Sequence, residues 1–143
     1  MLLLFLATTC LLVSNARAAD EGIDETGVDA DYELVEENVN YPVTLTETGF
    51  KYYKFSLPTQ GSGDTQDFTV LAQATDYTSD PDIYLATDPG LSAAEDIDTA
   101  EFITSCTAYG YDICVLSAAK IKEKEYAYIA IRCYESCNIS FRV

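Results

Sequence analysis

The sequence predicts an all-β protein, an antiparallel, jelly-roll-like β-sandwich of about eight strands held by two disulfides. Short apolar runs alternate with turn residues at a spacing of roughly ten residues, and within the runs apolar side chains recur at every second position. Four cysteines remain in the part of the chain that carries this pattern. Together these observations predict a small β domain stapled by disulfides.

The clearest alternation places Tyr53, Phe55 and Leu57 on one face of a strand, which Pro58 ends because proline cannot donate to a strand ladder. Only two segments fit a turn of helix, residues 92–101 and 118–124. The other expected strands are residues 43–45, 68–74, 82–86, 102–105, 113–116, 126–133 and 139–143.

The N-terminus carries the pattern of a secretory signal peptide. Residues 2–13 form an almost unbroken apolar run, and Ala16-Arg17-Ala18 supplies small residues at a cleavage site. The run is shorter than the roughly 20 apolar residues that a membrane-spanning helix needs. We therefore expect a signal peptide over residues 1–18, cleavage after Ala18, and a secreted product that is not inserted into a membrane.

Residues 19–40 are expected to form an acidic, disordered leader. Residues 20–40 contain nine acids and no base, so the segment is expected to stay solvated. In the functional alternative, this segment is a propeptide or an acidic binding site for a basic partner. Tyr32, Leu34 and Val35 would also allow part of the leader to dock as an edge strand. The β-sandwich domain is expected over residues 41–143.

Composition argues against several classes of function. The formal net charge is -16, so nucleic acid and anionic membrane surfaces are repelled. The chain contains no histidine, the commonest general base and metal ligand. A pair of carboxylates could hydrolyse a glycosidic bond without histidine, but in a chain with 24 acids such a pair arises by chance. No glycine-rich phosphate-binding loop follows an expected strand. We therefore expect no enzymatic activity and no cofactor other than calcium.

The four cysteines that follow the signal peptide are expected to pair locally, Cys106 with Cys114 and Cys133 with Cys137. Cys133 is expected to end one strand and Cys137 to begin its hairpin partner, at a separation that a disulfide spans. A zinc site built from the same thiols is the alternative. An oxidising secretory compartment favours the disulfides.

A cluster of aspartates suggests a calcium site. Asp76, Asp80, Asp82 and Asp88 lie within thirteen residues, and neighbouring hydroxyls add further oxygen atoms. Calcium takes about six to eight oxygen ligands. In the alternative interpretation Asp76 and Asp80 form turns, and Asp82 caps the entry to the next strand.

Asn138-Ile139-Ser140 matches the N-glycosylation sequon, so Asn138 is a candidate glycosylation site in a secreted protein. Secretion favours modification, whereas the position of Asn138 on a strand directly after Cys137 can hinder the transferase.

Three segments resemble the bacterial pre-peptidase C-terminal domain and its relatives in secreted eukaryotic proteins. They are Tyr52-Tyr53-Lys54-Phe55-Ser56-Leu57-Pro58, Ser79-Asp80-Pro81-Asp82-Ile83-Tyr84-Leu85 and Tyr126-Ala127-Tyr128-Ile129-Ala130-Ile131. The resemblance covers about residues 39–143. It implies a jelly-roll domain appended to larger secreted proteins, often peptidases, where it assists secretion, folding or substrate binding without chemistry. Some relatives bind calcium or fibrous proteins. The two disulfides and the missing partner domain depart from the pattern of many bacterial members, so we expect either a stand-alone module or a fragment of a longer gene product.

The function expected from these observations is a secreted, non-catalytic extracellular binding or adhesion module. The more specific hypothesis is a domain that calcium stabilises and that binds a carbohydrate or a protein. Its partner would be an extracellular protein or carbohydrate, or a larger parent protein. The alternative is an accessory or inhibitory domain of a secreted peptidase. A binding module predicts exposed tyrosines beside the disulfide loops, with Tyr109, Tyr111 and Tyr134 as candidates. An inhibitor predicts a protruding loop, for which residues 89–100 are the candidate.

Overall fold

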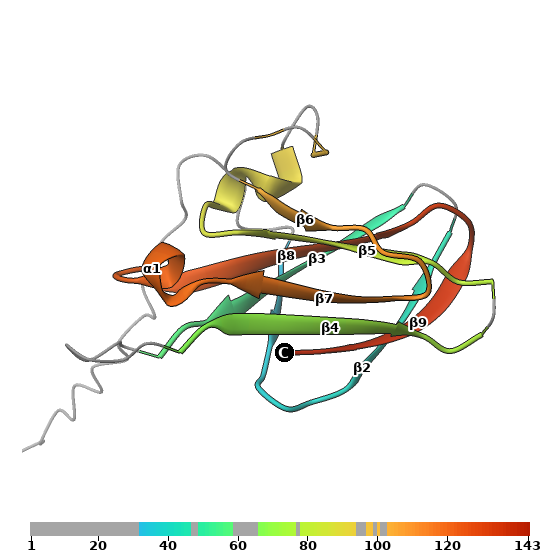
Figure 1. The fold of residues 1–143 in the computed structure, drawn as a ribbon, viewed down its shortest axis with the longest axis horizontal. Helices are drawn as coiled ribbons and strands as arrows, with labels where there is room; N and C mark the ends of the chain where they lie inside the picture. Colours follow the sequence, from blue (N-terminus) through green and yellow to red (C-terminus); the bar gives the residue numbers. More distant parts are fainter. Residues whose placement is uncertain are drawn as a thin grey trace, which may run out of the picture.

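The protein folds into two packed β-sheets (Figure 1). A computed structural model describes residues 32–46, 49–58, 66–76, 78–93, 97–98, 100 and 103–143. The strands are β1 (Glu33–Val35), β2 (Tyr41–Leu45), β3 (Phe50–Ser56), β4 (Phe68–Ala74), β5 (Pro81–Ala86), β6 (Thr104–Cys106), β7 (Tyr111–Leu116), β8 (Tyr126–Cys133) and β9 (Cys137–Arg142). Two short helices lie among the described residues, η2 (Pro89–Ala93) and α1 (Ala118–Ile121).

One sheet has the strand order β1-β3-β8-β5-β6 and the other the order β2-β9-β4-β7. β1 runs parallel to β3, and the other paired strands are antiparallel. The predicted antiparallel β-sandwich is thus confirmed, with nine strands in the described part of the chain instead of about eight.

The main core lies between the two sheets and contains the face predicted for β3. Tyr53 and Leu57 are buried in it, and Phe55 is half-buried against it. Phe141 of β9 is 1% exposed, and its ring centroid lies 4.6 Å from that of Tyr53 and 5.2 Å from that of Tyr41. Strands with period-two apolar patterns therefore meet face to face, as their sequence requires.

A second apolar cluster covers the outer face of the five-stranded sheet. Tyr84 of β5 and Tyr128 of β8 alternate with residues of the main core and so point away from it. Leu91 of η2 and Tyr32 pack over them, and the ring centroids of Tyr32 and Tyr128 are 4.9 Å apart. β5 is consequently buried along its whole length.

Hydrogen bonds hold η2 against this sheet. The Tyr32 hydroxyl donates to the carbonyl of Pro89 at 2.8 Å and accepts from the amide of Ser92 at 2.7 Å. Leu91 between them is 1% exposed. The described part of residues 89–100 therefore packs onto the sheet at these points instead of protruding from it.

β1 lies inside the segment predicted to be an acidic leader. It pairs with β3 so that Val35 stands opposite Phe55, and Val35 is 3% exposed in the main core. Tyr32 is buried in the second cluster, while Leu34 faces solvent. Docking as an edge strand is confirmed for Leu34 and Val35, and Tyr32 packs directly before the strand, so the folded part begins before residue 41. Residues 1–31, with the expected signal peptide, lie outside the described residues.

Both predicted disulfides are present, with Cα–Cα distances of 5.5 Å for Cys106–Cys114 and 6.3 Å for Cys133–Cys137. The hairpin expected around the second one is wrong. β8 and β9 belong to different sheets, so the turn between Cys133 and Cys137 crosses from one sheet to the other. Cys106 and Cys114 likewise join β6 of one sheet to β7 of the other. Each disulfide therefore links the two layers of the sandwich.

Candidate functional site

Three chain connections meet at one end of the sandwich, on the right in Figure 1. The amide of Thr75 donates to the carbonyl of Asn138 at 2.9 Å, and the amide of Asn138 donates to Ser79 Oγ at 3.2 Å. The amide of Gly110 donates to Asp80 Oδ1 at 2.8 Å. These contacts tie together the β4–β5, β6–β7 and β8–β9 connections. We call this region the tyrosine end and define it as residues 75–76, 78–80, 107–111 and 134–138.

The three tyrosines predicted to be exposed are exposed. Tyr109 is 82% exposed, and Tyr111 and Tyr134 are each 60% exposed. Gly110, between the first two, has a φ of 93°, in the left-handed region that favours glycine. The backbone at Gly110 thus presents two aromatic rings on either side of a tight turn.

A groove of about 440 Å³ opens beside these rings. Its walls combine Tyr109 and Tyr111 with four polar side chains, Gln73, Thr75, Asp76 and Ser79. No basic side chain is among the described lining residues. A concave surface with aromatic walls and a few polar groups is typical of ligand sites.

An apolar strip continues from the groove along the outer face of β7. Tyr111, Ile113 and Val115 point outward and are 60%, 55% and 41% exposed. Ile113 stands opposite Leu71 of β4, which is partly exposed as well. We call Tyr111, Ile113 and Val115 the β7 strip. Contiguous exposed apolar side chains on an edge strand mark interaction surfaces.

The four aspartates predicted to bind calcium are engaged at separate places. Asp76 Oδ1 accepts hydrogen bonds from the amides and hydroxyls of Thr78 and Ser79 at 2.6 to 3.1 Å, and the Ser79 hydroxyl does most to lower the pKa of Asp76. Asp88 Oδ1 accepts from the amide of Gly90 at 2.8 Å. The interpretation of Asp76 as a turn former is confirmed.

Asp80 and Asp82 do not behave as expected in either interpretation. Asp80 accepts from Gly110 and so holds the disulfide loop instead of its own turn. Asp82 does not cap the strand entry but is 3% exposed within β5. Across the described residues, no three or more histidine, cysteine, aspartate or glutamate side chains come together in a way that could hold a metal ion. The four aspartates thus lie at separate positions, and calcium binding by them stays a prediction.

Asp112 is the residue that sequence reasoning missed. It lies on β7 and is 1% exposed, because it shares the inward face of that strand with Cys114 and Leu116. Its Oδ1 accepts from the amide of Ala108 at 2.7 Å, and the amide of Ile83 also donates to this carboxylate. The alternation of inward residues in β7 was the signal that could have revealed it.

Asp82 and Asp112 are both buried acids with an unsatisfied oxygen. The Oδ2 atom of each finds no hydrogen-bond partner within the described part of the protein. Burial, followed by the charges of Asp112 and Asp80, raises the pKa of Asp82 to about 6, while Arg132 acts in the opposite direction. Burial also raises the pKa of Asp112. An ionised carboxylate in such surroundings is costly, so Asp82 opposes folding at neutral pH.

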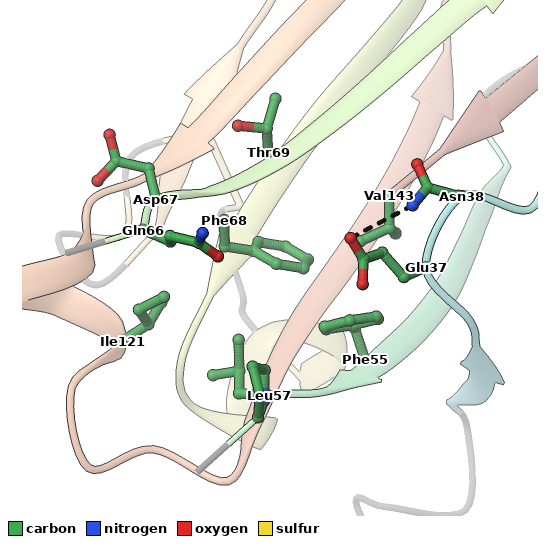
Figure 2. A pocket seen from close by; sticks show the side chains of 11 residues that line it. Glu37, Asn38, Phe55, Leu57, Gln66, Asp67, Phe68, Thr69, Ile121 and Val143 are labelled. Carbon is green, nitrogen blue, oxygen red and sulfur yellow. Dashed lines mark hydrogen bonds between the residues drawn. The ribbon is translucent and has the colours of Figure 1, made fainter. Parts of the chain in front are cut away.

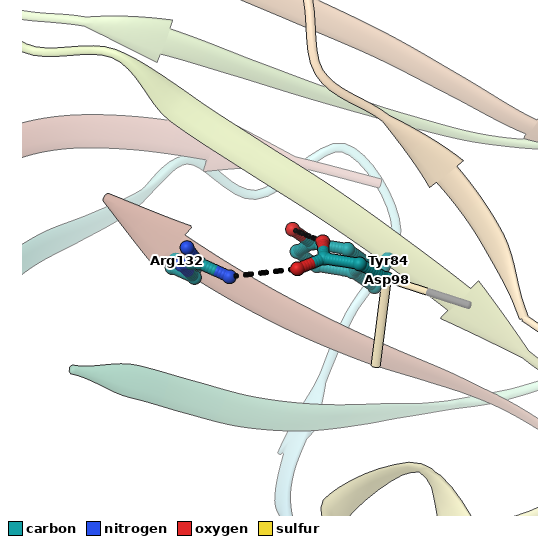
Figure 3. Close-up of polar contacts among 3 residues, drawn as sticks. All are labelled: Tyr84, Asp98 and Arg132. Carbon is teal, nitrogen blue, oxygen red and sulfur yellow. Dashed lines mark hydrogen bonds and ion pairs between the residues drawn. The ribbon is translucent and has the colours of Figure 1, made fainter. Parts of the chain in front are cut away.

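Arg132 connects the tyrosine end to the second apolar cluster. It donates to Asp98 Oδ2 at 3.3 Å, and Asp98 Oδ1 accepts the Tyr84 hydroxyl at 2.7 Å (Figure 3). Burial is the main cause that raises the pKa of Tyr84. The Arg132 guanidinium lies 4.7 Å from the ring centroid of Tyr134 and stands opposite Asp82 in the strand register. Tyr134 is thus held on the side of the five-stranded sheet.

A second pocket of about 230 Å³ lies at the other end of the sandwich (Figure 2). Its apolar lining includes Phe55, Leu57, Phe68 and Ile121, and polar residues such as Asp67 stand at its rim. Asp67 Oδ1 accepts from the amide of Ala118 at the start of α1 at 2.8 Å. This pocket is an incompletely filled end of the main core.

Asn138 of the predicted sequon is exposed on β9, where its Oδ1 accepts from the Thr44 hydroxyl at 2.8 Å. Its neighbour Ile139 is buried, so the Asn138 side chain lies on the outer face of the four-stranded sheet. Gln73 and Tyr111, which line the groove, are exposed on the same sheet.

Comparison with family models and with curated proteins finds no match to this chain. The resemblance to the pre-peptidase C-terminal domain therefore stays a prediction. None of the described helices is long and apolar enough to span a membrane.

Proposed function

We propose that this protein is a secreted, non-catalytic binding or adhesion module whose contact surface is the tyrosine end together with the β7 strip. The observation that carries the proposal is the pair of exposed rings of Tyr109 and Tyr111 beside a groove. Tyrosine offers a large, rigid and amphipathic contact area at a low cost in conformational entropy, and it is enriched at binding hot spots.

The frame beneath this surface is suited to binding. The Cys106–Cys114 disulfide and the hydrogen bonds from Ala108 and Gly110 to Asp112 and Asp80 fix the loop that carries Tyr109. A fixed loop loses little conformational freedom when a ligand docks, so less of the contact energy is lost to ordering. With a chain charge of -16, the partner is an extracellular protein or carbohydrate with a neutral or basic surface.

The non-catalytic part of the proposal rests on the chemistry of the same region. The chain has no histidine, and Asp76 Oδ1 already accepts four hydrogen bonds within its own turn. An accessory or inhibitory domain of a secreted peptidase ranks second, because the described part of its candidate loop is held against the sheet by Tyr32.

Secretion is supported by the two disulfides, which persist in oxidising compartments. Expression of the full chain in eukaryotic secretory cells, followed by N-terminal sequencing of protein from the medium, checks this part. We expect a mature N-terminus at Ala19, because cleavage is predicted after Ala18. Uncleaved protein that stays inside the cells would contradict secretion.

Binding is tested with arrays of defined glycans and purified extracellular proteins. Each array is probed with the wild-type protein, the double variant Tyr109→Ala/Tyr111→Ala and the control Leu34→Ala, which removes a 58% exposed side chain from β1. Loss of a tyrosine hot spot costs about 2 kcal/mol, or roughly thirtyfold in affinity. We expect the tyrosine variant to lose the ligands of the wild-type protein and Leu34→Ala to keep them. A wild-type protein that binds none of the probes, or a tyrosine variant with unchanged affinity, would overturn the proposal.

A further inference from the structure

We propose that the first sugars of an N-linked glycan on Asn138 lie in the groove against Tyr111 and Tyr109 and cover part of the contact surface. This inference rests on the proposed secretion of the chain. It assigns an occupant to the groove that is attached to the protein itself.

The backbone of Asn138 already touches two residues that line the groove. Its carbonyl accepts from the amide and the hydroxyl of Thr75 at 2.9 and 2.8 Å, and its amide donates to Ser79 Oγ at 3.2 Å. Thr75 and Ser79 in turn share the groove with Tyr109 and Tyr111. The modification site and the aromatic wall are thus on either side of one exposed residue, Thr75.

The strand order sets the direction and the length of the path. β4 lies between β9 and β7, and Gln73 of β4 pairs with Ser140 on one side and with Tyr111 on the other. These residues all point outward, as Asn138 does. Neighbouring strands are about 4.8 Å apart, so β9 and β7 are separated by about 10 Å across the face. Two sugar rings in series cover that span.

The lining fits a neutral sugar. Each pyranose ring has apolar C–H groups that can lie on a tyrosine face, and hydroxyl or acetamido groups that can bond to Gln73 and Thr75. A neutral sugar is also not repelled by the acidic chain. Because the glycan is tethered, its effective concentration at the groove is in the millimolar range, so a weak contact is enough for substantial occupancy.

The modification is an ordinary group transfer. The Asn138 side-chain nitrogen forms a bond to the anomeric carbon of an oligosaccharide carried on a lipid pyrophosphate. The bond from that carbon to the phosphate oxygen breaks, the lipid pyrophosphate leaves, and the amide loses one proton. The transferase of the secretory pathway supplies the donor, and no oxidation or reduction takes place.

The test compares full-length protein secreted by eukaryotic cells with two variants at one position. Ser140→Ala removes the sequon and leaves Asn138 in place, whereas Ser140→Thr keeps the sequon and is the matched control. Mass spectrometry measures the occupancy of Asn138. Nitration of tyrosines by tetranitromethane, mapped by peptide, measures how accessible each ring is. Tyr134 is the internal reference, because it is as exposed as Tyr111 and its ring lies over Arg132 on the other sheet.

We expect Tyr109 and Tyr111 to react about two- to tenfold more slowly in the glycosylated wild-type and Ser140→Thr proteins than in Ser140→Ala, with Tyr134 unchanged. Trimming the glycan to one sugar should restore part of the reactivity, because one ring does not span β4. An unmodified Asn138, or equal rates in all three proteins, would overturn the inference. Neither result would alter the array experiment, which tests the proposed function with Tyr109→Ala/Tyr111→Ala.

Discussion

At pH 7.5 the variant Asp82→Asn is expected to unfold with a free energy about 2 to 3 kcal/mol higher than that of the wild-type protein. Burial and the nearby acids raise the pKa of Asp82 from 3.8 to about 6. A carboxylic acid whose pKa is higher in the folded state favours folding while it stays protonated. Its contribution is complete below about pH 4 and is lost as the pH rises through 6. Asparagine carries no charge at any pH, so it avoids the loss.

The measurement is the free energy of unfolding in denaturant from pH 4 to pH 8. The difference between Asp82→Asn and the wild-type protein should be largest above pH 7 and close to zero near pH 4. Asp88→Asn is the matched control, because Asp88 is exposed and its Oδ1 accepts from the amide of Gly90, as an asparagine oxygen can. A difference that does not vary with pH would mean that Asp82 is not a buried acid in the folded protein.

The same proteins check whether calcium adds stability, which stays a prediction. Calcium bound at Asp80 and Asp82, as the sequence predicts, would offset the negative charge that Asp80 adds beside the buried Asp82. Melting curves in millimolar calcium, in millimolar magnesium and in excess chelator should then differ for the wild-type protein, and calcium alone should raise its melting temperature. Asp82→Asn should show no such rise. Equal curves for the wild-type protein in all three solutions would contradict the calcium prediction.

Phe141→Ala is expected to lower the free energy of unfolding by about 3 to 5 kcal/mol and to reduce the secreted yield strongly. The Phe141 ring is 1% exposed and packs between the rings of Tyr41 and Tyr53, so its removal leaves a cavity between the sheets. The two disulfides join the layers elsewhere and cannot fill that space.

Phe55→Ala is the matched control for this variant. Phe55 is half-buried and lines the pocket at the open end of the core, so part of its surface already lies outside the packed interior. We expect its loss to cost clearly less than that of Phe141 in the same denaturant titration. A larger loss for Phe55→Ala would mean that the packing centre lies at the pocket end and not around β9.

The sequence predicted what local patterns determine. Period-two alternation located most strands and placed Tyr53 and Leu57 in the core. The short separations of the cysteines predicted their pairing. A turn of three residues can join two strands of one sheet or lead from one sheet to the other, and only tertiary packing decides between them. The hairpin at Cys133 was wrong for that reason.

The site required information that no single segment carries. Asp82 follows Pro81 and reads as a turn residue, yet β5 is covered on one face by the main core and on the other by the cluster around Tyr84 and Leu91. Part of that second cover comes from Tyr32, which is about fifty residues away in the sequence. The burial of Asp112 and its hydrogen bond from the amide of Ile83 depend on the packing of β7 against β5, which no local pattern predicts. The exposed tyrosines were easier to predict, because short disulfide loops leave few places to bury them.

The two disulfides and the three tied connections bind the layers of the sandwich at the tyrosine end, while the pocket end has no covalent link among its described residues. The two sheets are therefore joined most firmly beneath the proposed contact surface. Separation of the sheets by heat or by mechanical tension should start at the pocket end, around Leu57 and Phe68, and reach the tyrosine end around Tyr109 last. A partner bound at the proposed contact surface would then hold the part of the protein that separates last.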